Sequence, residues 1–196
     1  MSKKSVKPRA TNRRDLLLEI AATQFVRNGF IGASMRDIAA AADMQPSSIY
    51  YHYASKEDLM LAVYEEGMTR IRRAVEDALE GLTTEPWERL ECACAAHLTA
   101  LLKGGDIFKA LMRETPEEWL HKENRMKQMR DSYESIIAGL IDDLPMPKGT
   151  DRRVMRLMLV GAMNWAHTWY QPKAGDPKKL AHQFVSLLRG PLGAAD

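Results

Sequence analysis

Apolar residues recur along most of this chain with the three- and four-residue spacing of amphipathic helices. In the first clear segment, Leu17, Ile20, Ala21 and Phe25 fall on one helical stripe. Sustained alternation of apolar and polar residues, the pattern of a half-buried strand, is not found. The sequence therefore predicts an all-α protein of about nine helices.

Capping signals divide this pattern into separate helices. Ser34 with Asp37, and again Ser55 with Asp58, stand at capping-box spacing, which marks a helix start. Gly29 supplies a stop for the first helix. The third helix is expected to begin at Pro46. The six helices after it are expected to cover about 56–81, 86–103, 106–114, 116–144, 151–170 and 176–190.

The second and third predicted helices are short and joined by a tight turn. Together with the first helix they fit within about 45 residues. The small side chains of "IAAAAD" (38–43) allow the two short helices to approach each other closely. This arrangement predicts a helix-turn-helix unit.

The third helix carries more polar groups than a core needs. Met44, Ile49 and Tyr53 can pack against the first two helices. The groups left outside can reach base edges and phosphates in a DNA major groove. They are Gln45, Ser47, Ser48, Tyr50, Tyr51 and His52. The alternative is that the tyrosines only hold the helices together.

Positive charge is concentrated at the N-terminus. The formal net charge is +2, but residues 1–56 hold nine Lys/Arg against four Asp/Glu, and the first 14 residues hold six Lys/Arg and no acid. This asymmetry indicates a polyanion partner for the first part of the chain. Residues 3–14 are then expected to form an arm that follows the DNA backbone or minor groove. A solubilising tail is the alternative.

Several classes of protein are not indicated. The chain has no apolar run long enough for a transmembrane helix and no apolar stretch typical of a secretory signal. Cys92 and Cys94 are expected to be reduced thiols, and the histidines lack metal-site spacing. His52 has no nucleophile or carboxylate partner spaced with it. We expect a cytoplasmic protein, not an enzyme, with no metal, cofactor or membrane partner.

Residues 20–59, "IAATQFVRNGFIGASMRDIAAAADMQPSSIYYHYASKEDL", closely resemble the DNA-binding domain of the TetR family. The matching residues are Ala21, Phe25, Gly29, Phe30, Ser34, Ile38, Ala39, Ala42, Ile49, Tyr50, Tyr51, His52, Tyr53, Ser55, Lys56 and Leu59. The resemblance implies a homodimer that represses transcription and leaves its double-stranded DNA operator when a ligand binds. It also implies a DNA-binding domain at 1–56 and a ligand-binding and dimerisation domain at 57–196.

The resemblance assigns roles by position. Arg36, Gln45, Ser47 and Ser48 would contact bases or the groove. The phosphate contacts would be Ser34, Tyr50, Tyr51, His52 and Lys56. Three positions depart from the family pattern, because Asp43 replaces a turn glycine, Gln45 a Ser/Thr cap and Ala33 a threonine. Aspartate tolerates the left-handed turn conformation, but the operator sequence cannot be carried over.

The C-terminal part is rich in methionine and aromatic residues, which can line an adaptable apolar cavity. The candidate pocket residues are Phe108, Met112, Trp119, Met126, Met129, Tyr133, Met158 and Trp165. The alternative is that they are ordinary core residues. Basic residues of the segment 122–130 would form a rim suited to an acyl-CoA thioester, or simply a solvated face. The segment "GAMNWAHTWY" also resembles TetR-type regulators that sense CoA thioesters.

The last two predicted helices offer stripes for a twofold four-helix interface. Its candidate residues are Val154, Leu157, Gly161, Trp169, Phe184 and Leu188. Twofold symmetry predicts a palindromic operator, although some of this surface can pack within one subunit. Two other functions remain open: a helical small-molecule-binding protein or enzyme with a basic tail, and a DNA-binding regulator without a ligand.

Overall fold

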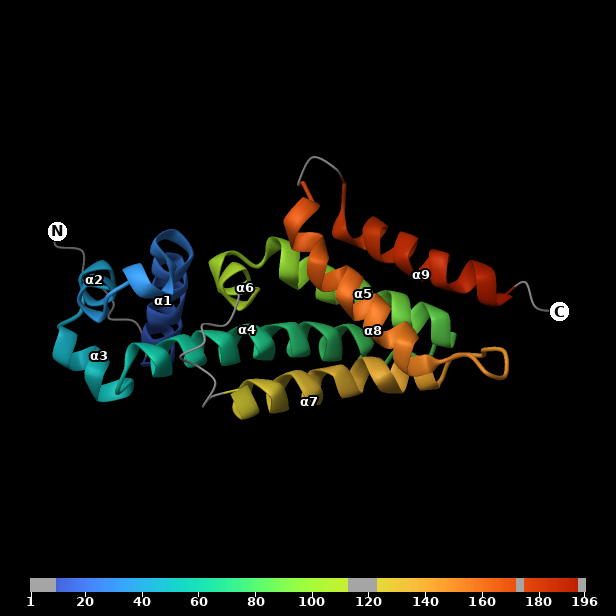
Figure 1. Ribbon diagram of the computed structural model, residues 1–196, viewed down its shortest axis with the longest axis horizontal. Helices are drawn as coiled ribbons and strands as arrows, with labels where there is room; N and C mark the ends of the chain where they lie inside the picture. Colours follow the sequence, from blue (N-terminus) through green and yellow to red (C-terminus); the bar gives the residue numbers. More distant parts are fainter. Residues whose placement is uncertain (1–9, 113–122, 172–174, 194–196) are drawn as a thin grey trace, which may run out of the picture.

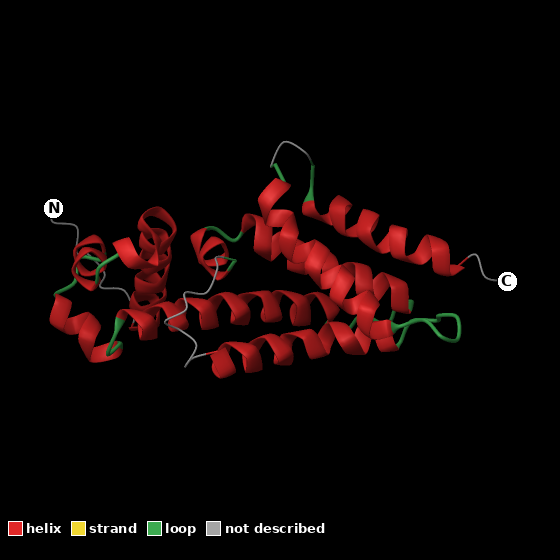
Figure 2. Ribbon diagram, in the orientation of Figure 1, coloured by secondary structure: helices red, strands yellow, loops and turns green. Residues whose placement is uncertain are grey.

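The computed structural model describes residues 10–112, 123–171 and 175–193 of the chain. All regular structure within these ranges is helical (Figure 2), which confirms the all-α prediction. The helices are α1 (Ala10–Gly32), α2 (Met35–Ala41), α3 (Pro46–His52), α4 (Lys56–Leu79), α5 (Pro86–Lys103), α6 (Asp106–Leu111), α7 (Glu123–Asp142), α8 (Arg152–Trp169) and α9 (Pro177–Gly193). Residues 116–122, expected in the seventh helix, lie outside the described ranges.

Helices α1, α2 and α3 form a small head at one end of the molecule, and α5, α7, α8 and α9 form a larger body (Figure 1). Helix α4 runs from the head into the body and contacts α1, α5, α6 and α7. The short helix α6 contacts both α1 and α4, so it also bridges the two parts. The head followed by a larger helical body confirms the predicted architecture.

Both predicted capping boxes are formed. The Ser34 hydroxyl accepts a hydrogen bond from the Asp37 backbone N–H at 3.2 Å and donates to the Asp37 carboxylate at 2.6 Å. Ser55 makes the same pair of contacts with Asp58, at 3.1 and 2.9 Å. Each box satisfies a backbone N–H that the first turn of a helix leaves unpaired. These local signals explain why α2 and α4 begin where the sequence predicts.

Two residues with positive φ set the chain direction in the head. Gly29 (φ 71°, ψ 169°) interrupts the helical conformation within α1, as its predicted stop requires. Asp43 (φ 51°) is the one non-glycine residue with positive φ in the described part of the chain, and it lies in the turn between α2 and α3. Aspartate is among the residues that adopt this conformation most readily. The tight turn therefore survives without glycine.

Lys56, the first residue of α4, fixes that helix to the end of α1. Its ammonium donates to the carbonyl oxygens of Phe30 at 2.7 Å, Ala33 at 2.9 Å and Ile31 at 3.3 Å. It also lies 4.5 Å from the centre of the Phe30 ring. Carbonyls at a helix C-terminus lack intrahelical partners and carry partial negative charge, so a cation stabilises them. The start of α4 is thus joined directly to the head.

Buried apolar side chains continue from the head into the body through α4. Ile38 and Ile49 are fully buried in the head, as are Leu98 and Ile137 in the body. Along α4, Leu59 at the start and Ile71 and Val75 towards the end are buried as well. Helix α4 therefore belongs to both cores. None of the helices in the described residues has the length and apolarity needed to cross a bilayer.

We predict that Lys56→Met lowers the free energy of unfolding by about 1–3 kcal/mol, because three carbonyl oxygens lose a charged donor while the aliphatic stem is kept. Chemical denaturation followed by circular dichroism measures this loss. Lys127→Met is the matched control, since Lys127 makes an exposed ion pair with Asp131 on the same helix. The control should unfold at the wild-type denaturant concentration. If Lys56→Met and Lys127→Met unfolded at the same denaturant concentration, the stabilising role of Lys56 would be contradicted.

Candidate nucleic-acid interface and buried cavity

The surface of α3 is almost entirely polar. Of its residues only Ile49 is buried, and the predicted contact residues Gln45, Ser47, Ser48, Tyr50, Tyr51 and His52 are all exposed. Tyr51 is 85% exposed, and its ring meets the His52 ring edge-on at 5.1 Å between centroids. A helix whose one buried residue is an isoleucine leaves hydroxyl, amide and imidazole groups exposed at the surface, where a partner could reach them.

The outer face of α3 borders an open groove that α1 and α4 complete. Arg13 and Arg14 of α1 line this groove together with Ser47, Ser48 and Tyr51 of α3. Two guanidinium groups thus border the same space as the polar side chains, together with the acids Asp43 and Glu65. This combination is suited to a nucleic-acid backbone beside readable bases, since arginine binds phosphate through paired N–H donors.

The remaining predicted DNA residues differ in how free they are. Arg36 of α2 is exposed. The Ser34 hydroxyl is used in the cap of α2, and the Lys56 ammonium points to the carbonyls at the end of α1. The position of Lys56 in the family pattern indicates a phosphate contact, whereas its three short contacts here are internal. Lys56 and the carbonyls that it contacts are 23–26 residues apart in sequence, so no local sequence pattern reveals these contacts.

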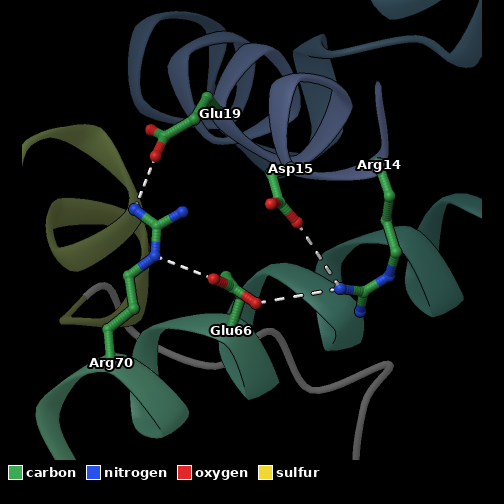
Figure 3. A network of polar contacts seen from close by, with 5 residues as sticks. All are labelled: Arg14, Asp15, Glu19, Glu66 and Arg70. Carbon is green, nitrogen blue, oxygen red and sulfur yellow. Dashed lines mark hydrogen bonds and ion pairs between the residues drawn. The ribbon is translucent and has the colours of Figure 1, made fainter. Parts of the chain in front are cut away.

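A network of ion pairs links α1 to the middle of α4 (Figure 3). Arg70 contacts Glu19 at 2.5 Å and Glu66 at 2.8 Å, and Glu66 is 3.8 Å from Arg14. Burial opposes the charged form of Arg70, but the hydrogen bonds with Glu19 and Glu66 outweigh it and raise the pKa of the guanidinium. Together with Lys56, this network joins the head to α4 over several helical turns.

Helix α6 forms a second link between head and body. The Thr23 hydroxyl of α1 donates to the Asp106 carboxylate of α6 at 2.9 Å. On the other side α6 packs closely against Gly67 of α4, where an added Cβ would lie 3.3 Å from Ile107 and 3.4 Å from Leu111. The absence of a side chain at Gly67 allows this approach. A displacement of α6 would therefore act on both α1 and α4.

A small cavity lies in the body, next to the middle of α4 and the end of α6. Its volume is about 60 Å³, and its apolar lining comes from Met68, Ile71, Leu111, Met112 and Val160. Its polar lining comes from Tyr64, His97, Arg130, Tyr133, Glu134 and Asn164. Helices α4, α5, α7 and α8 and the end of α6 all contribute residues. Ligand cavities combine an apolar wall with a few convergent polar groups in this way.

His97 of α5 is the buried polar group of this cavity, with 1% of its surface exposed. Its Nδ1 lies 2.7 Å from the Tyr133 hydroxyl, whereas its Nε2 has no hydrogen-bond partner among the described residues. Burial lowers the pKa of His97 to about 4, and a weaker hydrogen-bonding contact with the Asn164 side chain only partly opposes this shift. Burial also raises the pKa of Tyr133. Both groups are therefore uncharged at neutral pH.

The predicted pocket residues separate into three groups. Met112 and Tyr133 line the cavity. Phe108 and Met126 are buried elsewhere in the core, and Met129 is partly buried against it. Trp119 lies outside the described residues. The remaining two, Met158 and Trp165, are 56% and 66% exposed on α8 and do not line this cavity.

Sequence reasoning did not single out His97 or Asn164. The position of His97 carried a usable signal, because it shares one stripe of α5 with the buried residues Leu90, Cys94, Leu98 and Leu101. A polar residue within an apolar stripe indicates a buried polar group. Asn164 has no comparable signal, since its neighbours Met163 and Trp165 face opposite environments.

One face of α8 is apolar and exposed. Val154, Leu157, Met158, Trp165 and Trp169 all lie on it with about half or more of their surface exposed. Met158 lies on this face because it follows Val154 by four residues. Trp165 lies on it because it follows Met158 by seven residues and precedes Trp169 by four. Of the other predicted dimer residues, Gly161 is exposed, and Phe184 and Leu188 of α9 are partly buried against the core. A face of this kind indicates a protein interface.

Comparison with known proteins matches both parts of the chain. Residues 17–63 match the sequence profile of bacterial regulatory proteins of the tetR family, and residues 83–192 match the tetracyclin repressor-like C-terminal domain. The HTH-type transcriptional repressor KstR2 of Mycolicibacterium smegmatis (strain ATCC 700084 / mc(2)155) is 34% identical over 191 residues, which cover 91% of this chain and 90% of that protein.

Two solved structures share the fold. The structure of AibR in complex with isovaleryl coenzyme A and operator DNA has a TM-score of 0.74 at 21% identity, covering 89% of this chain and 97% of that one. The structure of FadR from Bacillus subtilis in complex with stearoyl-CoA has a TM-score of 0.73 at 20% identity, covering 89% and 96%. Since sequence profiles match both the head and the body and a relative 34% identical spans 91% of the chain, the protein belongs to the tetR family of bacterial regulatory proteins.

Proposed function

We propose that the protein is a cytoplasmic, homodimeric repressor that holds a palindromic operator through the outer face of α3 and is released by a small effector. The effector is an acyl-CoA thioester or a similar apolar molecule, and it binds in the cavity of the body. No catalytic step is involved. The domain division follows the same logic, with DNA contacts in residues 1–56 and effector and dimer contacts in 57–196.

The observation that carries this proposal is the course of α4. Lys56 at its start is bonded to the head, and Tyr64, Met68 and Ile71 in its middle line the cavity. One rigid helix therefore contacts both the part that would bind DNA and the part that would bind the effector. The names of the similar proteins support the same function, since KstR2 is a transcriptional repressor and AibR was solved with a CoA thioester and operator DNA.

The size of the cavity suggests how an effector would act. Sites for small-molecule ligands usually have volumes of roughly 300–1,000 Å³, whereas this cavity holds about 60 Å³. An effector must therefore displace part of the lining. Leu111 and Met112 at the end of α6 and Met68 on α4 line the cavity, and both helices contact α1 of the head. We infer that this displacement changes the angle between the two heads of the dimer, which must match successive major grooves about 34 Å apart.

A direct test uses a duplex selected from random sequence by the purified protein. We expect a palindromic site, and we expect at least one thioester in a series from isovaleryl- to stearoyl-CoA to weaken its binding by about tenfold or more, as a coupling of 1–3 kcal/mol requires. Fluorescence anisotropy of labelled duplex measures the change. CoA alone is the control and should have no such effect. Failure to select any duplex would refute the DNA-binding function itself.

We predict that Arg36→Ala weakens binding to the selected duplex by about 10- to 100-fold, because a side-chain contact to a base is worth about 1–3 kcal/mol. Arg153→Ala is the matched control, since it removes an exposed arginine from the start of α8, far from the head. The two variants should bind random DNA equally. If Arg36→Ala lost affinity for the selected and the random duplex to the same extent, Arg36 would only supply charge, and if it bound both duplexes like the control, Arg36 would not contact DNA.

We predict that Trp165→Glu converts the dimer into a monomer and weakens operator binding, because a carboxylate would be buried in an apolar interface. The monomer itself should stay folded, since Trp165 is 66% exposed. Analytical ultracentrifugation and circular dichroism measure the two properties. Leu16→Glu, at a similarly exposed apolar position on α1, is the control and should remain dimeric. A dimeric Trp165→Glu protein would place the interface elsewhere.

A further inference from the structure

The Nε2 atom of His97 indicates which chemical group of an effector the cavity would bind, which the cavity volume does not. Tyrosine and cysteine apart, His97 is the one buried polar residue among those described. Its Nε2 lines the cavity of the body without a hydrogen-bond partner. Leaving a buried polar atom unpaired is unfavourable, and such atoms in folded proteins commonly have a functional reason. The Asn164 side chain, which also lines the cavity, interacts with the ring closely enough to oppose the lowering of its pKa, so a molecule that enters the cavity would compete with Asn164 for this nitrogen.

The contact with Tyr133 determines whether this nitrogen donates or accepts. If the Tyr133 hydroxyl donates to Nδ1, the proton of neutral His97 is on Nε2, and only that N–H lacks a partner. If Nδ1–H donates to the hydroxyl oxygen instead, both the hydroxyl hydrogen and the Nε2 lone pair lack partners. The first arrangement leaves fewer buried groups unsatisfied, so it is favoured. His97 then directs an N–H donor into the cavity.

We propose that this Nε2–H binds the carbonyl oxygen of the effector, and that the carbonyl belongs to a neutral acyl group such as a thioester rather than to a free carboxylate. The inference rests on the proposed function and specifies the ligand chemistry of its cavity. The His97 contact would thus make the protein bind an acyl thioester more tightly than a molecule of the same shape without the carbonyl.

The charges around the cavity favour a neutral acyl group at this point. His97 itself is uncharged, and the Glu134 carboxylate, paired with Arg156 at 2.9 Å, lines the same space. A carboxylate beside Nε2 would therefore share the cavity with the Glu134 carboxylate, and Arg130 would be the one lining cation free of that ion pair. Arg130 is the other charged lining residue, and its side chain is exposed. Its guanidinium acts on the Tyr64 hydroxyl, and an exposed cation on the cavity lining suits the phosphates of a CoA moiety.

The test compares isovaleryl-CoA with 3-methylbutyl-CoA, the thioether that keeps the chain and the CoA but lacks the carbonyl oxygen. We expect isothermal titration calorimetry to show that the wild-type protein binds the thioester about tenfold or more tightly, because the thioether leaves Nε2–H unpaired. Free isovalerate should bind more weakly than the thioester. Equal binding of thioester and thioether, equally tight binding of isovalerate, or no binding of the thioester would each overturn the proposal.

Variants assign the preference to His97. In His97→Phe the preference for thioester over thioether should fall to within about twofold, whereas His97→Gln, which keeps an N–H donor, should retain part of it. If His97→Phe unfolds, the double variant His97→Phe with Tyr133→Phe removes both partners together and should melt no lower than wild type. A full preference in a folded variant without the donor would contradict the role of His97.

Operator release separates this inference from the proposed function. If the thioether releases the selected duplex as effectively as the thioester, the protein is still an effector-controlled repressor, but the carbonyl contact is refuted. If neither the thioester series nor the thioether releases the duplex, effector control itself fails. Release by the thioester alone, together with loss of this difference in His97→Phe, is the result that we expect.

Discussion

Because α4 supplies buried side chains to both the head and the body, neither part can repack without moving the other. Lys56 bonds the start of α4 to the head, and the ion pairs of Glu66 and Arg70 bond its middle to α1 (Figure 3). In the same middle stretch, Tyr64, Met68 and Ile71 form a wall of the cavity. Under the proposed function, regulation requires only that this wall be displaced, since a packed core transmits strain instead of absorbing it.

The features that the sequence predicts correctly are those encoded by neighbouring residues. The two serine capping boxes, the stop at Gly29 and the turn at Asp43 each depend on residues within one or two helical turns, so the elements of the head follow from local rules. The polar face of α3 follows from them as well, because a short helix with one buried isoleucine must expose its other side chains.

The features that were not predicted depend on contacts between residues far apart in sequence. The family position of Lys56 indicates a phosphate contact, whereas its internal acceptors lie at the end of α1 and just after it. Methionine and tryptophan suit both an interior and an interface, so the sequence predicts Met158 and Trp165 in the pocket, whereas the packing of α8 on its neighbours leaves both exposed. The pairing of His97 with Tyr133 joins residues 36 positions apart, which no local pattern encodes.

Helix α3 buries only Ile49, with the flanking Met44 and Tyr53 packed partly against the core, and this has a consequence for how such proteins diverge. Its outward residues can be exchanged with little effect on folding, so duplicated copies of the gene can drift towards new binding sites while each intermediate remains folded. Residues in the body, where charge and packing are shared by several helices, have much less freedom. Target choice is thus the property most open to natural variation.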